Sequence, residues 1–224
     1  MIKYLKNIFL IAMTLTFTQA CTAKKAKTEH HKIVSFPSEI DKSCRNGRAK
    51  IYDECSNQTD LFNAAQARTI KEDKTLLVSY GAEWCIWCHV FNAYIKGEVD
   101  KFTYTYGEPG KTKRWTDTLY ERAKRDVTKE ANALNTYVSE NFVIVHIDYE
   151  HASGSDDVLN QSGAHAKFNG SLPYIFTVDK TGDFAAVFKS KNAEIRRDTI
   201  DWYRGYDRVR LLRELTSLRE AAIE

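Results

Sequence analysis

The 224-residue chain is poor in proline, glycine and methionine, with 3, 10 and 2 residues of each. So little proline and glycine excludes a collagen-like or low-complexity protein, and 43% hydrophobic with 28% charged residues is ordinary for a globular one. The formal net charge is only +3, so the composition gives no indication of a nucleic-acid partner. The length suits one domain of moderate size that can bury a hydrophobic core.

The apolar stretch near the N-terminus is too short to cross a membrane, which takes roughly 20 residues. It spans residues 8–17 (IFLIAMTLTF), follows Lys3 and Lys6, and precedes the small-residue exit Thr18-Gln19-Ala20. A basic start, a short apolar core and a small-residue exit are typical of a secretory signal peptide. Residues 1–20 are therefore predicted to be one, and export is expected.

Cys21 follows this exit and resembles the lipid-modified cysteine of bacterial lipoproteins, although Thr18 stands where that family usually has leucine. An exported chain with five cysteines would carry one odd thiol. Lipid on Cys21 leaves four cysteines, enough for two disulfides. Cleavage after Ala23 leaves the same four, and ordinary cleavage after Ala20 is also open. We expect lipidation and a periplasmic, membrane-anchored protein, with a soluble periplasmic one as the alternative.

Residues 21–57 are predicted to form a tether and a small disulfide loop. Residues 22–42 are polar and lysine-bearing without a sustained period, which indicates a flexible linker. Cys44 and Cys55 bracket a short polar loop, and in an exported protein the expected role of such a pair is a structural disulfide. A second redox pair and half of a zinc site are the alternatives. No close pair of further ligands completes a metal tetrad, so no metal is expected.

Residues 58–224 show helix and strand patterns that alternate along the chain and then end in a hairpin and a helix. Such an order predicts an α/β sandwich with a central mixed sheet. Helices are expected from Thr59 or Asp60 (with Leu61, Ala64, Ala65 and Ile70 inward), from Cys85, from Leu119 to Val138, and from Leu211 to Ala222. Strands are expected at 76–80, 142–147, 174–178 and 184–188, and residues 101–114 are expected to be irregular.

The informative motif is Trp84-Cys85-Ile86-Trp87-Cys88, which directly follows the strand at 76–80 and opens a helix. Two cysteines with this spacing can close a disulfide at a helix N-terminus. Free backbone N–H groups and the positive end of the helix dipole stabilise a thiolate there. Cys85 is therefore predicted to be the nucleophile. Cys88, one turn deeper, is predicted to resolve the mixed disulfide.

Leu76 to Cys88 (LLVSYGAEWCIWC) resembles the strand and active-site segment of the thioredoxin superfamily, and 171–176 (SLPYIF) resembles its cis-proline loop. The resemblance covers about residues 58–224, with a helical insertion at about 98–139. It implies a thioredoxin-like fold and a thiol–disulfide oxidoreductase that needs no cofactor. It also implies a substrate groove made by Trp84, Leu172 and a cis Pro173.

This chain departs from the family pattern at the buried acid six residues before the first cysteine, where it has Ser79. The strand lysine that often partners this acid falls on Ile144. A water held by Ser79 is one candidate for the proton relay of Cys88. Glu83 is the other nearby group, and a solvated carboxylate is its expected state.

Cys85-Ile86-Trp87-Cys88-His89 also satisfies the C-x-x-C-H motif for attachment of c-type haem. A second axial ligand would come from the remaining histidines, His30, His31, His146, His151 and His165, because no methionine survives signal removal. The thioredoxin-like residues on both sides favour the redox interpretation, in which His89 tunes Cys85.

A binding module of the same fold without turnover is a third interpretation, and the tyrosines of the insertion would then form its interaction surface (Tyr104, Tyr106, Tyr120 and Tyr137). The presence of both cysteines favours an enzyme. Its expected partners are protein disulfides or dithiols and an electron-transfer protein. The sequence does not fix the direction of electron flow, because that depends on the redox potential.

Overall fold

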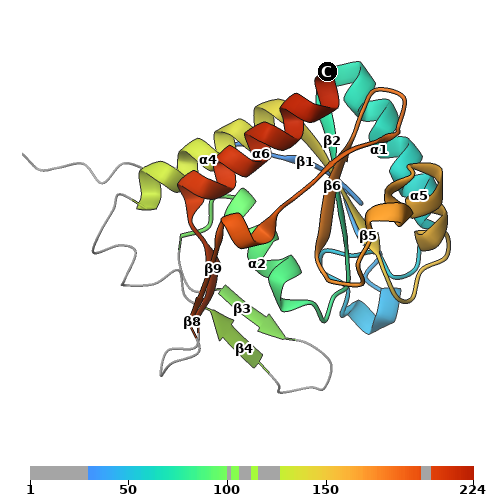
Figure 1. Ribbon diagram of the computed structural model, residues 1–224. Helices are drawn as coiled ribbons and strands as arrows, with labels where there is room; N and C mark the ends of the chain where they lie inside the picture. The colour runs from blue at the N-terminus through green and yellow to red at the C-terminus, as the bar shows by residue number, and fades with distance from the viewer. Residues whose placement is uncertain (1–29, 100–101, 106–111, 116–126, 198–202) are drawn as a thin grey trace, which may run out of the picture.

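The computed structural model describes residues 30–99, 102–105, 112–115, 127–197 and 203–224, and it is built on a five-stranded mixed sheet (Figure 1). The strand order is β1 (Val34–Phe36), β5 (Phe142–Asp148), β2 (Thr75–Gly81), β6 (Tyr174–Val178) and β7 (Phe184–Val187). β1, β5 and β2 are parallel, and β6 and β7 are antiparallel to their neighbours. β2, β5 and β6 are buried along their whole length, which explains their nearly continuous apolar sequences.

Helices cover both faces of this sheet. One core cluster packs against α2 (Ile86–Ile95), α4 (Val127–Asn141) and α6 (Arg208–Ile223), and the other packs against α1 (Gln58–Glu72) and α5 (Ser155–Gln161). Short 3-10 helices lie at Cys44–Gly47, Ala164–Lys167 and Ser190–Asn192. Together these elements form a thioredoxin-like α/β/α sandwich, and the predicted fold class is confirmed.

The segment between α2 and β5 contains a β-hairpin as well as a helix. β3 (Phe102–Thr105) pairs antiparallel with β4 (Thr112–Trp115), so the expectation of an irregular 101–114 is wrong. The alternation of aromatic residues from Phe102 was a strand signal. The predicted long helix is present from Val127, with its apolar positions buried, while Leu119 and Ala123 lie outside the described residues.

A second hairpin was not predicted: β8 (Glu194–Arg197) pairs with β9 (Tyr203–Tyr206) just before α6. Both β3 and β9 contact α2. Two hairpins therefore lie beside α2, and β3–β4 precedes α4 in the sequence whereas β8–β9 follows it (Figure 1).

The domain begins before residue 58, which corrects the predicted extent of the tether. Val34–Phe36 forms an edge strand that pairs with Val143–Val145, and Ile33 packs against the core. The backbone N–H of His31 donates to Asn135 Oδ1 at 2.6 Å. Residues 30–57 are thus part of the folded domain, whereas residues 1–29, including the predicted signal peptide and Cys21, lie outside the described residues.

Two details of α1 also differ from the prediction. Its N-cap is Asn57, whose side chain accepts a hydrogen bond from the backbone N–H of Asp60. The inward face is formed by Phe62, Ala65 and Thr69, and Ile70 is exposed.

In the part of the chain that the structure describes, no helix combines the length and apolar character needed to cross a membrane.

Candidate active site

Cys85 and Cys88 are joined by a disulfide at the end of β2, where the chain turns into α2. Cys85 is the N-cap of α2, and its Sγ accepts a hydrogen bond from the backbone N–H of Cys88 at 3.2 Å. The first turn of α2 contains no acidic residue. An anionic sulfur on Cys85 would therefore meet free N–H groups and the positive end of the helix dipole, with no carboxylate in that turn opposing it.

Both cysteines are buried. The exposed fraction is 4% for Cys85 and 1% for Cys88, and both pack against Tyr52 and Ala82. Trp87, between the cysteines, packs edge-on against Tyr206 of β9 with ring centroids 5.4 Å apart. Both cysteines are thus covered by the protein, and Cys85 Sγ lies at the N-terminal end of the helix.

Cys44 and Cys55 form the predicted second disulfide, which closes the loop that carries Tyr52. Asp53 lies inside this loop, and one carboxylate oxygen accepts the backbone N–H of Cys55 at 2.9 Å. The ligand-type atoms of Cys44, Asp53 and Cys55 lie within 4.8 Å of one another. Because the two sulfurs are bonded to each other, they are not free to bind a metal.

Glu83 is buried, so the expectation of a solvated carboxylate is wrong. Its exposed fraction is 5%, and Oε1 accepts the backbone N–H groups of Lys50, Ile51 and Tyr52. Burial opposes ionisation, but the hydrogen bond from His89 and those from the backbone outweigh it and lower the pKa of Glu83. Glu83 is therefore an anionic anchor that fixes the Cys44–Cys55 loop beside the cysteines.

His89 is directed at Glu83 rather than at Cys85. Its Nε2 donates to the Glu83 carbonyl oxygen at 2.8 Å and lies 3.4 Å from Glu83 Oε2. An effect of His89 on Cys85 would therefore be indirect. This position also does not fit an axial haem ligand, because the ring nitrogen that would face the iron is engaged inside the protein.

Ser79, one candidate to hold a water for the proton relay, has a protein partner. Its Oγ lies 3.0 Å from the hydroxyl of Tyr52. The residue beside Ser79 on the neighbouring strand is His146, whereas Ile144 pairs with Leu77. His146 packs edge-on against the Tyr52 ring at 5.4 Å, and burial lowers its pKa to about 3, so it is neutral at ordinary pH.

The predicted groove residues gather around the cysteines. Trp84 is 38% exposed, and its indole N–H donates to Glu150 Oε2 at 2.6 Å. Leu172 packs against the cluster that contains both cysteines, and the Leu172–Pro173 peptide bond is cis. An exposed indole and a leucine two residues before β6 thus lie near the disulfide.

Two residues near the cysteines were not found from the sequence. Tyr52 is fully buried, and its sequence neighbours in a polar loop give no sign of that position. Asp148 ends β5 and is paired with Gly81. Its Oδ2 accepts three backbone N–H groups, while Oδ1, also buried, has no hydrogen-bond partner among the residues that the structure describes. Its place at the end of a strand beside the motif was the available signal for Asp148.

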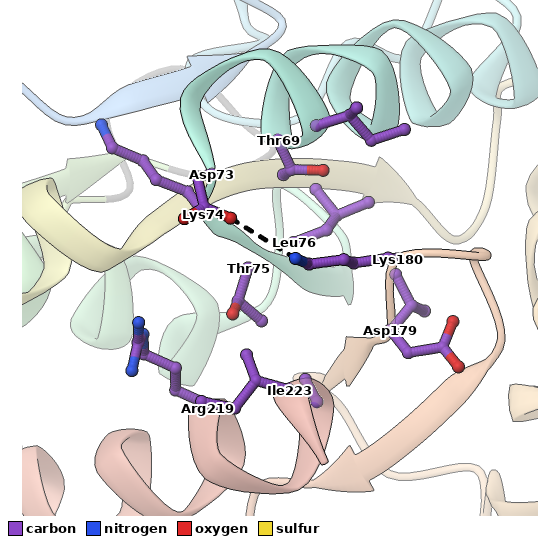
Figure 2. Close-up of a pocket in the computed structure, with 12 residues that line it drawn as sticks. Thr69, Asp73, Lys74, Thr75, Leu76, Asp179, Lys180, Arg219 and Ile223 are labelled. Carbon is purple, nitrogen blue, oxygen red and sulfur yellow. Dashed lines mark hydrogen bonds and ion pairs between the residues drawn. The ribbon is translucent and has the colours of Figure 1, made fainter.

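Three cavities in the described part of the chain lie away from the disulfide. One of about 410 Å³ is at the opposite end of β2, where Lys180 pairs with Asp73 at 3.5 Å and Thr69, Arg219 and Ile223 are among the lining residues (Figure 2). Two others, of about 360 and 310 Å³, lie between α2 and residues 30–51. These two share four lining residues: Ser35, Asn92, Lys96 and His146.

Neither a protein-family model nor a curated protein sequence matches this chain. The chain is similar to a solved structure described as disulphide isomerase from Xylella fastidiosa Temecula1, with 16% identity and a TM-score of 0.35. The alignment covers 61% of this chain and 77% of that one. At this TM-score the likeness carries no argument, so the fold rests on the topology described above.

Proposed function

We propose that this protein is a thiol–disulfide oxidoreductase that acts on protein disulfides or dithiols through Cys85 and Cys88. The observation that carries the proposal is the Cys85–Cys88 disulfide at the N-terminus of α2, with Cys85 as the N-cap of that helix. A sulfur in that position is stabilised as a thiolate, which is the attacking species in disulfide exchange.

In the reducing direction the Cys85 thiolate attacks one sulfur of a substrate disulfide. A bond forms between Cys85 Sγ and that sulfur, and the other substrate sulfur leaves as a thiolate that takes up a proton. Cys88 then attacks Cys85 Sγ, which releases the second substrate sulfur and closes the Cys85–Cys88 disulfide. The oxidising direction is the reverse sequence, and the reduction potential of the pair decides which one prevails.

Trp84, Leu172 and Pro173 are proposed to form the groove in which the substrate chain lies. Trp84 supplies exposed aromatic surface, and the Leu172 backbone precedes β6 at the same end of the sheet as the cysteines. An extended substrate segment could pair with this backbone as a short added strand.

Trp84→Ala is expected to raise KM more than it lowers kcat.

The test is dithiol-driven reduction of an insulin-like disulfide substrate. The wild-type protein is expected to turn over, Cys85→Ser is expected to be inactive, and Cys44→Ala/Cys55→Ala is the matched pair that removes a disulfide outside the reacting one. No turnover by a folded wild-type protein would favour the binding-module interpretation. A Soret band on protein made in a host with active haem attachment would contradict both the oxidoreductase and the binding-module interpretations and would indicate a c-type cytochrome.

The location and partners belong to the same proposal. The signal-like residues 1–20 and Cys21 support a lipid-anchored protein on the periplasmic side of a bacterial membrane. There the pair would meet exported proteins that carry disulfides, and it would exchange electrons with a separate redox protein.

A further inference from the structure

The Tyr52 hydroxyl and the Cys88 sulfur share one small space beside Gly81. A Cβ built on Gly81 would lie 2.5 Å from the Tyr52 hydroxyl oxygen and 2.6 Å from Cys88 Sγ. Both distances are below any normal contact, so only glycine allows these two atoms to approach the strand together. Tyr52, Cys85 and Cys88 belong to one buried cluster.

Tyr52 is held there from several sides. Its backbone N–H donates to Glu83 Oε1 at 2.8 Å, its hydroxyl lies 3.0 Å from Ser79 Oγ, and its ring packs against His146. The Cys44–Cys55 disulfide closes the loop in which it lies. Its hydroxyl is therefore pre-positioned, and little ordering is needed when Cys88 reacts.

Cys88 must become a thiolate in a place where water does not reach it. Its exposed fraction is 1%, and burial disfavours a charged sulfur unless a hydrogen-bond donor faces it. We infer that the Tyr52 hydroxyl donates a hydrogen bond to the Cys88 thiolate, while the Ser79 hydroxyl donates to the Tyr52 oxygen. The inference rests on the proposed function, because only the resolving step requires this thiolate.

Tyr52 is suited to be a donor over the whole working range. Burial, more than its neighbours, raises the pKa of Tyr52, so the hydroxyl keeps its proton. Other titratable groups around Tyr52 and Cys88 are Cys85 and His89 on α2, Glu83 in the preceding turn, and His146 and Asp148 on β5. Asp148 is the alternative partner, because its buried Oδ1 has no hydrogen bond within the described part of the chain.

The assigned step balances without another reagent. The Cys88 thiol gives up its proton, its sulfur bonds to Cys85 Sγ, and the bond between Cys85 and the substrate sulfur breaks. The departing substrate sulfur takes that proton and leaves as a thiol. Tyr52 keeps its own proton throughout and stabilises the charge on Cys88 as the charge appears.

The test measures how readily Cys88 ionises, without requiring turnover. In the full chain with Cys21→Ser and Cys85→Ser, Cys88 is the one thiol outside the Cys44–Cys55 disulfide. Its alkylation by iodoacetamide is followed by mass spectrometry across pH. Tyr52→Phe is expected to raise the apparent pKa of Cys88 and to slow alkylation about tenfold at neutral pH.

Tyr80→Phe is the matched control. Tyr80 is fully buried on β2, between Ser79 and Gly81, but it packs in the other core cluster and its hydroxyl contacts Asp156. We expect no change in Cys88 alkylation for this variant. Ser79→Ala keeps the Tyr52 ring and is expected to give a smaller slowing, so it serves as the second test if Tyr52→Phe does not fold.

An unchanged alkylation profile in folded Tyr52→Phe would overturn the inference even if the wild-type protein reduces insulin. So would a tenfold slowing in Asp148→Asn with none in Tyr52→Phe, because the role would then belong to Asp148. If the wild-type protein fails to reduce insulin while Tyr52→Phe still slows Cys88 alkylation, the hydrogen bond stands and the proposed function fails.

Discussion

At the scale of single residues, Glu83 connects the active-site turn to the loop that carries Tyr52. The lowered pKa of Glu83 means that folding favours its charged form. Stability from this carboxylate is therefore fully present above the pKa of an unfolded glutamate, 4.5, and is lost as the pH falls through the lower folded value. Acid should loosen the Cys44–Cys55 loop through this one group.

We predict that Glu83→Gln lowers the free energy of unfolding by about 2 kcal/mol at neutral pH, because a charged acceptor of three backbone N–H groups is replaced by a neutral one. Urea unfolding of the oxidised protein at pH 7 and at about pH 3.5 measures this. The difference in the free energy of unfolding between Glu83→Gln and wild type should be smaller at the lower pH. Glu220→Gln, at an exposed position of α6, is the control, and an equal difference at both pH values would contradict the account.

The residues that sequence reasoning placed well are those whose role follows from local pattern. Cys85 and Cys88 could be placed because an apolar run before them indicates a buried strand and the spacing of apolar residues after them indicates a helix. Glu83 and Tyr52 could not, because their burial depends on each other across 31 positions of the chain. Nothing next to either residue in the sequence reports that contact.

At the scale of elements, the long buried strands, the long helices and the edge strand β7 were predictable, whereas the short helix α5 and the short strands β1, β8 and β9 were not. β2, β5 and β6 have apolar runs that fit a sheet covered on both faces. β1 has only three residues and a polar setting, and β8 and β9 have four each, too few to show a period. Their existence depends on pairing with distant strands or with each other.

The two disulfides are expected to differ in redox potential. Cys55 is exposed whereas Cys85 and Cys88 are buried, so access alone would favour opening Cys44–Cys55 first. Which disulfide opens first at equilibrium depends instead on how stable each reduced cysteine pair is. The N-terminal end of α2 stabilises a Cys85 thiolate, which favours reduction of Cys85–Cys88. Equilibration in glutathione buffers of increasing reducing power, followed by peptide mapping, should show Cys85–Cys88 opening first.

The variant Cys44→Ala/Cys55→Ala is the control for that titration, since it should retain the earlier transition and lose the later one. Its free energy of unfolding should fall by about 3 kcal/mol on the chain-entropy estimate for a loop of this size. A map that joined Cys44 to Cys85, or a Cys44–Cys55 bond that opened first at equilibrium, would contradict the assignment of roles.

At the scale of the whole molecule, the membrane anchor is a separate prediction from the chemistry. We expect the mature chain to begin at Cys21 with attached acyl chains and to fractionate with membranes, because several chains anchor stably and one binds only marginally. Intact-mass measurement decides this. Cys21→Ser should release active enzyme in soluble form, and a wild-type mature chain starting at Thr22 or later would rule out the anchor.

The central claim is that Cys85 attacks and Cys88 resolves. Cys88→Ser removes the resolving sulfur, so a substrate captured by Cys85 should remain attached. The direct measurement is intact-mass and peptide mapping of Cys88→Ser after incubation with an insulin-like disulfide substrate, with Cys85→Ser as the control. The account predicts a dithiol-sensitive adduct on Cys85 in Cys88→Ser and none in Cys85→Ser. An adduct on Cys88 in Cys85→Ser, with none in Cys88→Ser, would contradict it.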